Sequence, residues 1–260
     1  MGVRNHLVFL KKFFGIELAS AMEYRFNFIA QSFGMFLNNL IWIFFWYILF
    51  QKFESMNGWS FHDMALLYAI VTISFGLTGV FFGQVRRIAT MIEGGALDYF
   101  ITLPKNVLLH SIAKLRYPAT GDLFFGIFIS LFILSWSQVP LFILLVICGA
   151  VFFLNYAIIF GSIAFFTGRF EAGARTANET LIIFSTYPYS VFSGFSKFLL
   201  LFVIPAGFIS GVPVELLKSF NLEWFIILIG FMIASSAFAI WLFYKGLRRY
   251  ESGNTIALRG

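Results

Sequence analysis

Hydrophobic residues run through this chain in long stretches that short polar segments interrupt. A helix of about 20 apolar residues is long enough to cross the hydrocarbon core of a bilayer. The stretches predict six transmembrane helices, over residues 26–50, 64–82, 118–136, 139–166, 179–189 and 224–244. The pattern therefore predicts an all-α integral membrane protein, with residues 1–260 forming a single transmembrane domain.

The apolar region over residues 181–217 is too long for one span. Pro188, Pro205 and Pro213 interrupt it, and proline removes a backbone donor and breaks a helix. Broken backbone at membrane depth is tolerated where protein or a water-filled cavity shields it. We predict a short fifth span that ends near Tyr189, then a re-entrant helical hairpin over residues 192–218. Seven or eight full spans are the alternative.

Residues 5–22 show a different pattern, in which one helical face is apolar and the other is polar. Leu7, Leu10, Phe13, Phe14 and Leu18 share the apolar face, whereas Lys11, Lys12 and Glu17 are polar. This pattern is typical of a helix that lies along a membrane surface. We therefore expect an N-terminal interfacial helix before the first span.

Composition and charge agree with a membrane protein. Hydrophobic residues make up 60% of the chain and charged residues only 12%, whereas a soluble domain carries about 25% charged residues. The net charge of +6 does not indicate a nucleic-acid partner, because the 18 Lys and Arg residues form short clusters between the spans. With six spans and an inner N-terminus, 15 of these cations fall on the inner side and three, Lys52, Lys197 and Lys218, on the outer side. Cytoplasmic loops carry an excess of Lys and Arg, so we expect both termini to be cytoplasmic in a cell membrane protein.

The motifs of nucleotide, metal and acyl-transfer sites are absent from the sequence. There is no Gly-Lys pair for a phosphate-binding loop, no His-Glu-x-x-His and no Gly-x-Ser-x-Gly. His6, His62 and His110 are widely spaced, and Cys148 lies inside an apolar stretch. We predict no catalytic residue, no cofactor and no metal site.

Acidic residues argue against a carrier driven by an ion gradient. Such a carrier needs acids near the membrane midplane, but Asp122 and Glu179 fall near the inner ends of their predicted spans. The sequence favours a conduit driven from outside the membrane. A self-sufficient secondary carrier or channel, or a non-transporting membrane assembly protein, is the alternative.

Polar residues follow one face of the first span. Asn27, Gln31, Asn38 and Trp42 recur at helical spacing, with Asn39 beside them. They could line a substrate path, or they could bond to neighbouring helices or face a partner subunit. On the second span, Gly76, Gly79 and Gly83 would allow a neighbouring helix to approach closely.

The longest inner segment spans residues 83–117. After Gly94-Gly95, an amphipathic stretch runs from Leu97 to Leu103 and stops at Pro104. A solvated loop does not need so many apolar side chains, so this segment packs on the membrane or on a partner protein.

The segment resembles the loop between the second and third spans of type-2 ATP-binding-cassette exporter permeases. The resemblance rests on Glu93-Gly94-Gly95-Ala96-Leu97-Asp98 and Leu103-Pro104. The residues Tyr187-Pro188, Val203 to Phe208 and Pro213 are similar to the late region of the viologen-exporter-like multidrug permeases.

This resemblance implies a permease subunit that works with a separate cytoplasmic P-loop ATPase. Two permease chains, identical or merely similar, would enclose the path between them. By position, Arg87, Glu93, Gly94, Leu97, Asp98 and Pro104 would form the contact with the ATPase. A loop that lies on the membrane without a partner is the alternative.

Overall fold

A computed structural model describes the backbone of residues 3–53 and 55–250 and the side chains of residues 11–53 and 55–250. The described residues form helices and contain no β-strand, apart from two isolated bridges. The longer helices are α1 (Val3–Glu23), α2 (Arg25–Lys52), α3 (Phe61–Phe82), α7 (Pro118–Ile133), α8 (Val139–Ser162), α10 (Glu171–Ser185) and α13 (Leu222–Leu247). The all-α prediction is confirmed.

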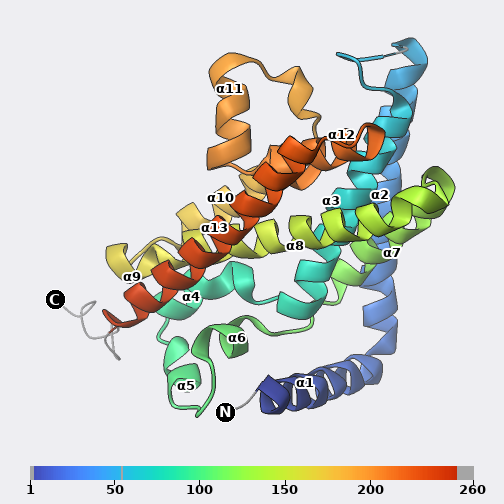
Figure 1. Cartoon of the computed structure of the whole chain (residues 1–260). Helices are drawn as coiled ribbons and strands as arrows, with labels where there is room; N and C mark the ends of the chain where they lie inside the picture. The colour runs from blue at the N-terminus through green and yellow to red at the C-terminus, as the bar shows by residue number, and fades with distance from the viewer. Residues whose placement is uncertain (1–2, 54, 251–260) are drawn as a thin grey trace.

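Short helices connect the long ones (Figure 1). They are η1 (Val85–Arg87), α4 (Ile88–Glu93), α5 (Leu97–Ile101), α6 (Val107–Ile112), η2 (Trp136–Gln138), α9 (Ala164–Thr167), η3 (Tyr189–Val191), α11 (Gly194–Phe198), η4 (Leu199–Val203), η5 (Gly207–Gly211) and α12 (Val212–Lys218). Below, the α5 end means residues 83–117, and the α11 end means residues 53–60 and 189–221.

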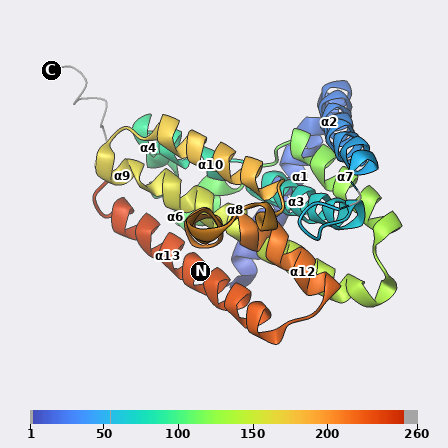
Figure 2. The same ribbon diagram turned by 90° about the horizontal axis from the view of Figure 1, so that it is seen from above.

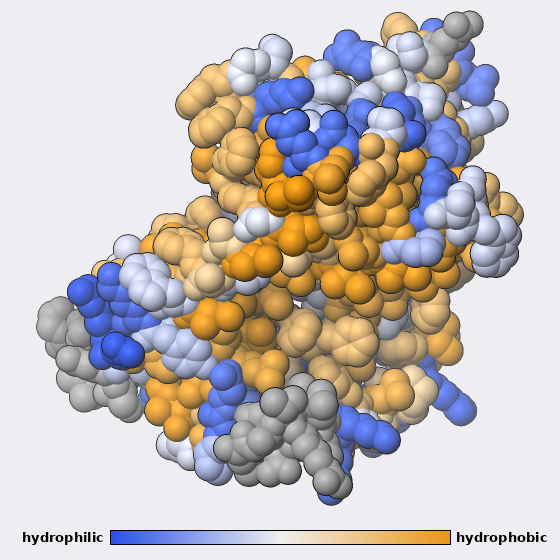
Figure 3. All heavy atoms as spheres, in the orientation of Figure 1, coloured by the Kyte–Doolittle hydropathy of each residue, from blue (hydrophilic) through white to orange (hydrophobic). Residues whose placement is uncertain are grey.

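Four helical segments of the described chain are long and apolar enough to cross a membrane: α2, α3, α8 with its flanking turns, and α13. Helix α7 is apolar but has 16 residues, and α10 has 15. Figure 3 shows a broad apolar band across the molecule, with polar residues gathered at its edges. The chain is an integral membrane protein, and the number of crossings stays a prediction.

Helix α3 lies at the centre of the bundle, where it packs against α7 and α8 and also contacts α2. Its glycines allow this approach, as the sequence predicted. A Cβ at Gly76 would lie 2.7 Å from the backbone nitrogen of Leu123, and one at Gly79 would clash with Ala119. Helix α8 is flanked by α10 and α13, which lie beside it in both views (Figures 1 and 2).

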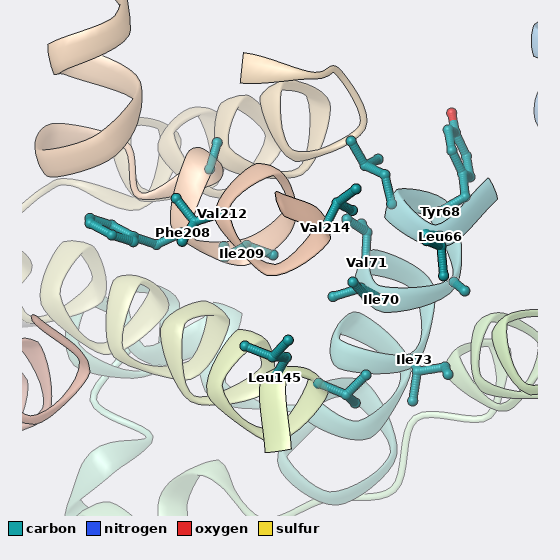
Figure 4. Close-up of a cluster of buried hydrophobic side chains, with 14 of the residues drawn as sticks. Leu66, Tyr68, Ile70, Val71, Ile73, Leu145, Phe208, Ile209, Val212 and Val214 are labelled. Atoms are coloured by element: carbon teal, nitrogen blue, oxygen red, sulfur yellow. The ribbon is translucent and has the colours of Figure 1, made fainter. Parts of the chain in front are cut away.

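A broken helix occupies the region predicted to be re-entrant. The segments Gly194–Val203 and Gly207–Lys218 meet at an angle of 78°. Its second segment lies between α3 and α8, where Ile209 belongs to the same buried cluster as Ile70 and Leu145 (Figure 4). Phe208 points away from α3 and packs against Phe152 of α8 and Phe231 of α13.

Both ends of this broken helix lie beside the loop between α2 and α3. The Asn57 side chain donates to the carbonyl of Ser190, 3.4 Å away, and Lys218 Nζ donates to the carbonyl of Gly58, also 3.4 Å away. Lys218 Nζ also pairs with the Asp63 carboxylate at 3.1 Å. The chain therefore leaves and returns at the α11 end.

Helix boundaries differ from the predicted spans where a side chain supplies a cap. Helix α3 begins three residues before the predicted span, because Ser60 and Asp63 form a capping box. Helix α10 begins at Glu171 and ends at Ser185, whereas the fifth span was predicted over residues 179–189. The other long helices match their predicted spans within a few residues.

Candidate translocation and coupling sites

A cavity of about 240 Å³ lies among α2, α3, α7 and α10. Asn38 and Trp42 line it, as two of the four path residues that the sequence predicted. The remaining wall is a mixture of aromatic, aliphatic and hydroxyl side chains that includes Tyr68, Thr72, Phe75, Thr186 and Tyr187.

An acid and an amide bonded to each other also line this cavity. The side chain of Asn39 donates to Asp122 Oδ1 at 2.8 Å, and both residues are buried. The sequence placed Asn39 beside the polar stripe and Asp122 near the end of its span, but it gave no reason to bring the two together. A buried carboxylate is costly unless it is hydrogen-bonded, so the bond from Asn39 stabilises Asp122 in this wall.

The other two predicted path residues lie apart from the cavity. Asn27 and Gln31 are exposed, and Gln31 Nε2 donates to Asn27 Oδ1 at 2.8 Å. They extend the same face of α2 toward α1.

At the α5 end, α4 and α5 form a sharp corner. Gly95 turns the chain with a φ of +72°, a conformation that favours glycine. Leu97 then inserts into an apolar cluster with Ile88, Ala239 and Phe243. Since Leu97 is fully buried, its side chain fixes α5 to the bundle and offers no contact surface of its own.

Asp98 lies on the other side of the corner, next to the Tyr250 side chain. Burial and the adjoining Asp98 carboxylate raise the pKa of the Tyr250 hydroxyl. This contact joins α5 to the chain just after α13.

Glu93 connects the corner to α10. Its Oε1 accepts from the backbone N–H groups of Phe170 and Glu171, at 2.5 and 2.6 Å. These are donors at the start of α10 that would otherwise lack an intrahelical partner. Glu93 therefore caps a helix that forms one wall of the cavity.

Arg87, Gly94 and Pro104 are exposed at the α5 end, as a partner surface requires. The exposed side of α5 itself contains Tyr99 (66% exposed) and Ile101 (43% exposed). Both lie in the amphipathic stretch from Leu97 to Leu103, but the sequence prediction did not select them as contact residues. Their spacing of two and four residues from Leu97 could not show which side chain faces outward.

Comparison with known proteins identifies the family. A family model described as ABC-2 family transporter protein matches residues 36–254. The chain belongs to the ABC-2 family. The match covers the whole α5 end and every residue that lines the cavity except Met35, and it leaves out Asn27 and Gln31. No curated protein and no solved structure matches the chain.

Membership of the ABC-2 family makes the chain a multi-pass transmembrane transport subunit. The family implies a bilayer setting and an ATPase partner. Among the described residues, no group of three or more His, Cys, Asp or Glu residues is placed to hold a metal ion.

Proposed function

We propose that this ABC-2 chain is the permease subunit of an ATP-driven exporter, coupled to a separate cytoplasmic ATPase and paired with a second permease chain. It would lie in the cell membrane with both termini in the cytoplasm, as the charge bias suggests. The likeness of its late region to viologen-exporter-like permeases supports a multidrug substrate range.

The attachment of α5 to the bundle is the observation that supports coupling to an ATPase. Its inner side is fixed by Leu97 within the apolar cluster, while Tyr99 and Ile101 stand exposed on its outer side. A short helix attached in this way would pass a movement of the ATPase on to the bundle, because it cannot tilt without displacing α13 and α10. The coupling contact then consists of Arg87, Gly94 and Pro104 with Tyr99 and Ile101, while Glu93, Leu97 and Asp98 hold them in place.

The cavity supports the second part of the proposal. It opens beside the exposed face of α2, so a second chain placed against that face would close it into a path between two subunits. Asn38 and Trp42 would then line the path, and Asn27 and Gln31 would lie at its inner mouth.

The coupling is tested by purifying the tagged chain in mild detergent and measuring how much ATPase accompanies it. We expect the double variant Tyr99→Asp, Ile101→Asp to lose most of the ATPase, since an interface residue of this kind contributes about 2 kcal/mol. The matched control is Phe220→Asp, at an equally exposed apolar residue of the α11 end, which should keep the ATPase. Equal retention by both variants would contradict the proposal.

A secondary carrier is the alternative, and the buried Asp122 in the cavity wall is the observation that favours it. Purified chain in liposomes distinguishes the two. Solute movement driven by an ion gradient without ATP or ATPase, and abolished in Asp122→Asn, would establish the carrier.

A further inference from the structure

A second cavity, of about 490 Å³, lies at the α5 end. Three separate segments line it: the end of α3 with η1 and α4, the linker before α7, and the start of α10. Five cations lie on its wall, and Glu171 is the acid among the lining residues. The cations are Arg86, Arg87, Lys114, Arg116 and Arg175.

Backbone contacts hold two of these basic segments together. Gly83 N–H donates to the carbonyl of Lys114 at 2.8 Å, and Gln84 N–H donates to the carbonyl of Ile112 at 3.2 Å. A Cβ on Gly83 would lie 2.7 Å from Arg116 Cβ and 2.8 Å from the Lys114 carbonyl. The backbone contacts between the two segments therefore bring their like charges close together, whatever the conformations of the side chains.

Four of these five cations form no close ion pair within the described part of the chain. Among the described residues, Arg175 pairs with Glu179 at 3.8 Å, whereas no carboxylate lies within ion-pair distance of Arg86, Arg87, Lys114 or Arg116. Burial and the charge of Arg116 lower the pKa of the Arg86 guanidinium, and the opposing attraction of the Glu179 carboxylate does not offset them. Like charges in a partly buried site repel one another unless an anion neutralises them.

We infer that this basic cavity binds a phosphate group, and that the group is the headgroup of an anionic phospholipid. Arg is suited to phosphate because its planar fork donates two parallel hydrogen bonds. A cavity of this size is ample for a phosphate with its glycerol.

The position of the cavity favours a lipid over a soluble phosphate compound. Phe81, two residues before Gly83, packs edge-to-face against Phe14 of α1, with ring centroids 5.6 Å apart. Since the pattern of α1 predicts a helix that lies along the membrane surface, the contact of Phe81 with α1 would place this end of the molecule at headgroup depth. The bound phosphate would tie η1 and α4 to α7 and α10. Arg87 belongs both to this wall and to the proposed coupling contact, so the test below leaves Arg87 unchanged and uses the permease chain without an ATPase.

The test uses the purified full-length chain in neutral detergent, with native mass spectrometry and thermal unfolding as readouts. Phosphatidylglycerol is compared with phosphatidylcholine and with sn-glycerol 3-phosphate. We expect phosphatidylglycerol to stay bound and to raise the unfolding temperature, and the other two to do neither. If glycerol 3-phosphate alone has both effects, the site takes a soluble phosphate and the lipid assignment is overturned.

The variant is Arg86→Gln with Arg116→Gln, and the control is Arg248→Gln with Arg249→Gln, two exposed cations outside the cavity. We expect the cavity variant to bind phosphatidylglycerol at least about tenfold more weakly, because charge-assisted hydrogen bonds are lost, and the control to bind as before. The variant Arg86→Lys with Arg116→Lys keeps both positive charges and should recover much of the phosphatidylglycerol binding.

The unfolding temperature without lipid distinguishes a specific loss of lipid binding from misfolding of the variant. The cavity variant removes the repulsion between Arg86 and Arg116 but also the attractions of Glu179 for Arg86 and of Asp122 for Arg116. In lipid-free detergent it should therefore unfold at a temperature close to that of the native chain. If it binds phosphatidylglycerol like the native chain, or if the control loses binding equally, the cavity is only part of a diffuse positive surface and the inference fails.

Discussion

Helices α2 and α3 have similar lengths and apolar compositions, yet their surroundings differ sharply. Within the most apolar 18 residues of each, 78% are buried in α3 but only 17% in α2. Helix α3 is enclosed by protein on all sides, whereas α2 packs mainly on α7 with one face and leaves the others open. Hydropathy thus identifies a spanning helix but not the material that will surround it.

The polar residues of the two helices differ in the same way. In α3, Ser74 Oγ donates to the carbonyl of Val146 at 2.9 Å, and Thr78 Oγ1 donates to the carbonyl of Ala150 at 3.1 Å. Such bonds hold α8 in place. In α2, Asn38 is exposed at the cavity, and its neighbour Asn39 is buried against Asp122. A polar residue in a spanning helix therefore bonds to a neighbouring helix when it faces protein, and is available to line a path when it faces a cavity.

The largest expected effect comes from adding one methyl group to each helix. Gly76→Ala in α3 must push away the backbone of Leu123, so we expect a loss of about 3 kcal/mol in the free energy of unfolding. Gly34→Ala in α2 is the control, since nothing lies within 4 Å of its added Cβ, and it should gain about 0.5 kcal/mol from helix propensity. Thermal unfolding in detergent measures both. Equal melting temperatures would show that α3 is no more tightly enclosed than α2.

A medium effect is expected within α2 itself, at two adjacent asparagines. Asn39→Leu leaves the buried Asp122 carboxylate without its donor, so we expect a destabilisation of about 2 kcal/mol. Asn38→Leu should change stability by less than about 0.5 kcal/mol but should reduce transport if the cavity is part of the path. Unfolding and transport are measured on both variants. If Asn39→Leu is as stable as the native chain, or if Asn38→Leu transports fully, the two asparagines do not have the separate roles in packing and in the path.

The smallest expected effect concerns α10, which is neither enclosed like α3 nor open like α2. Glu93→Ala removes the cap at its start, at an expected cost of about 1 kcal/mol. Glu179→Ala, which breaks only the exposed pair with Arg175, should cost less than about 0.5 kcal/mol. Hydrogen exchange at the Phe170 and Glu171 amides should accelerate in the first variant and not in the second.

The sequence predicted the helical class, the break near Pro205 and the corner at Gly94-Gly95, because each depends on residues close together in the chain. The interfacial position of α1 stays a prediction. The start of α10 was missed because its cap, Glu93, lies 77 residues before Phe170. The roles of Leu97, Tyr99 and Ile101 could not be separated, because the direction in which a five-residue helix faces is set by its neighbours. The Asn39–Asp122 bond joins residues 83 positions apart, and no spacing rule connects them.

The loop at residues 56–59 holds both ends of the broken helix, and this arrangement constrains the order in which the chain folds. Its contacts bring together residues 133 and 160 positions apart in the chain. During synthesis the loop is completed early, but its two partners emerge only after most of the protein has been made. The side of α3 that contacts η5 and α12 must therefore wait, uncovered by its final neighbours, until the last quarter of the chain arrives. Contacts of such long range slow folding and leave apolar surface open to wrong partners. A chain that ends before residue 190 would leave these apolar surfaces of α3 and α8 without their cover.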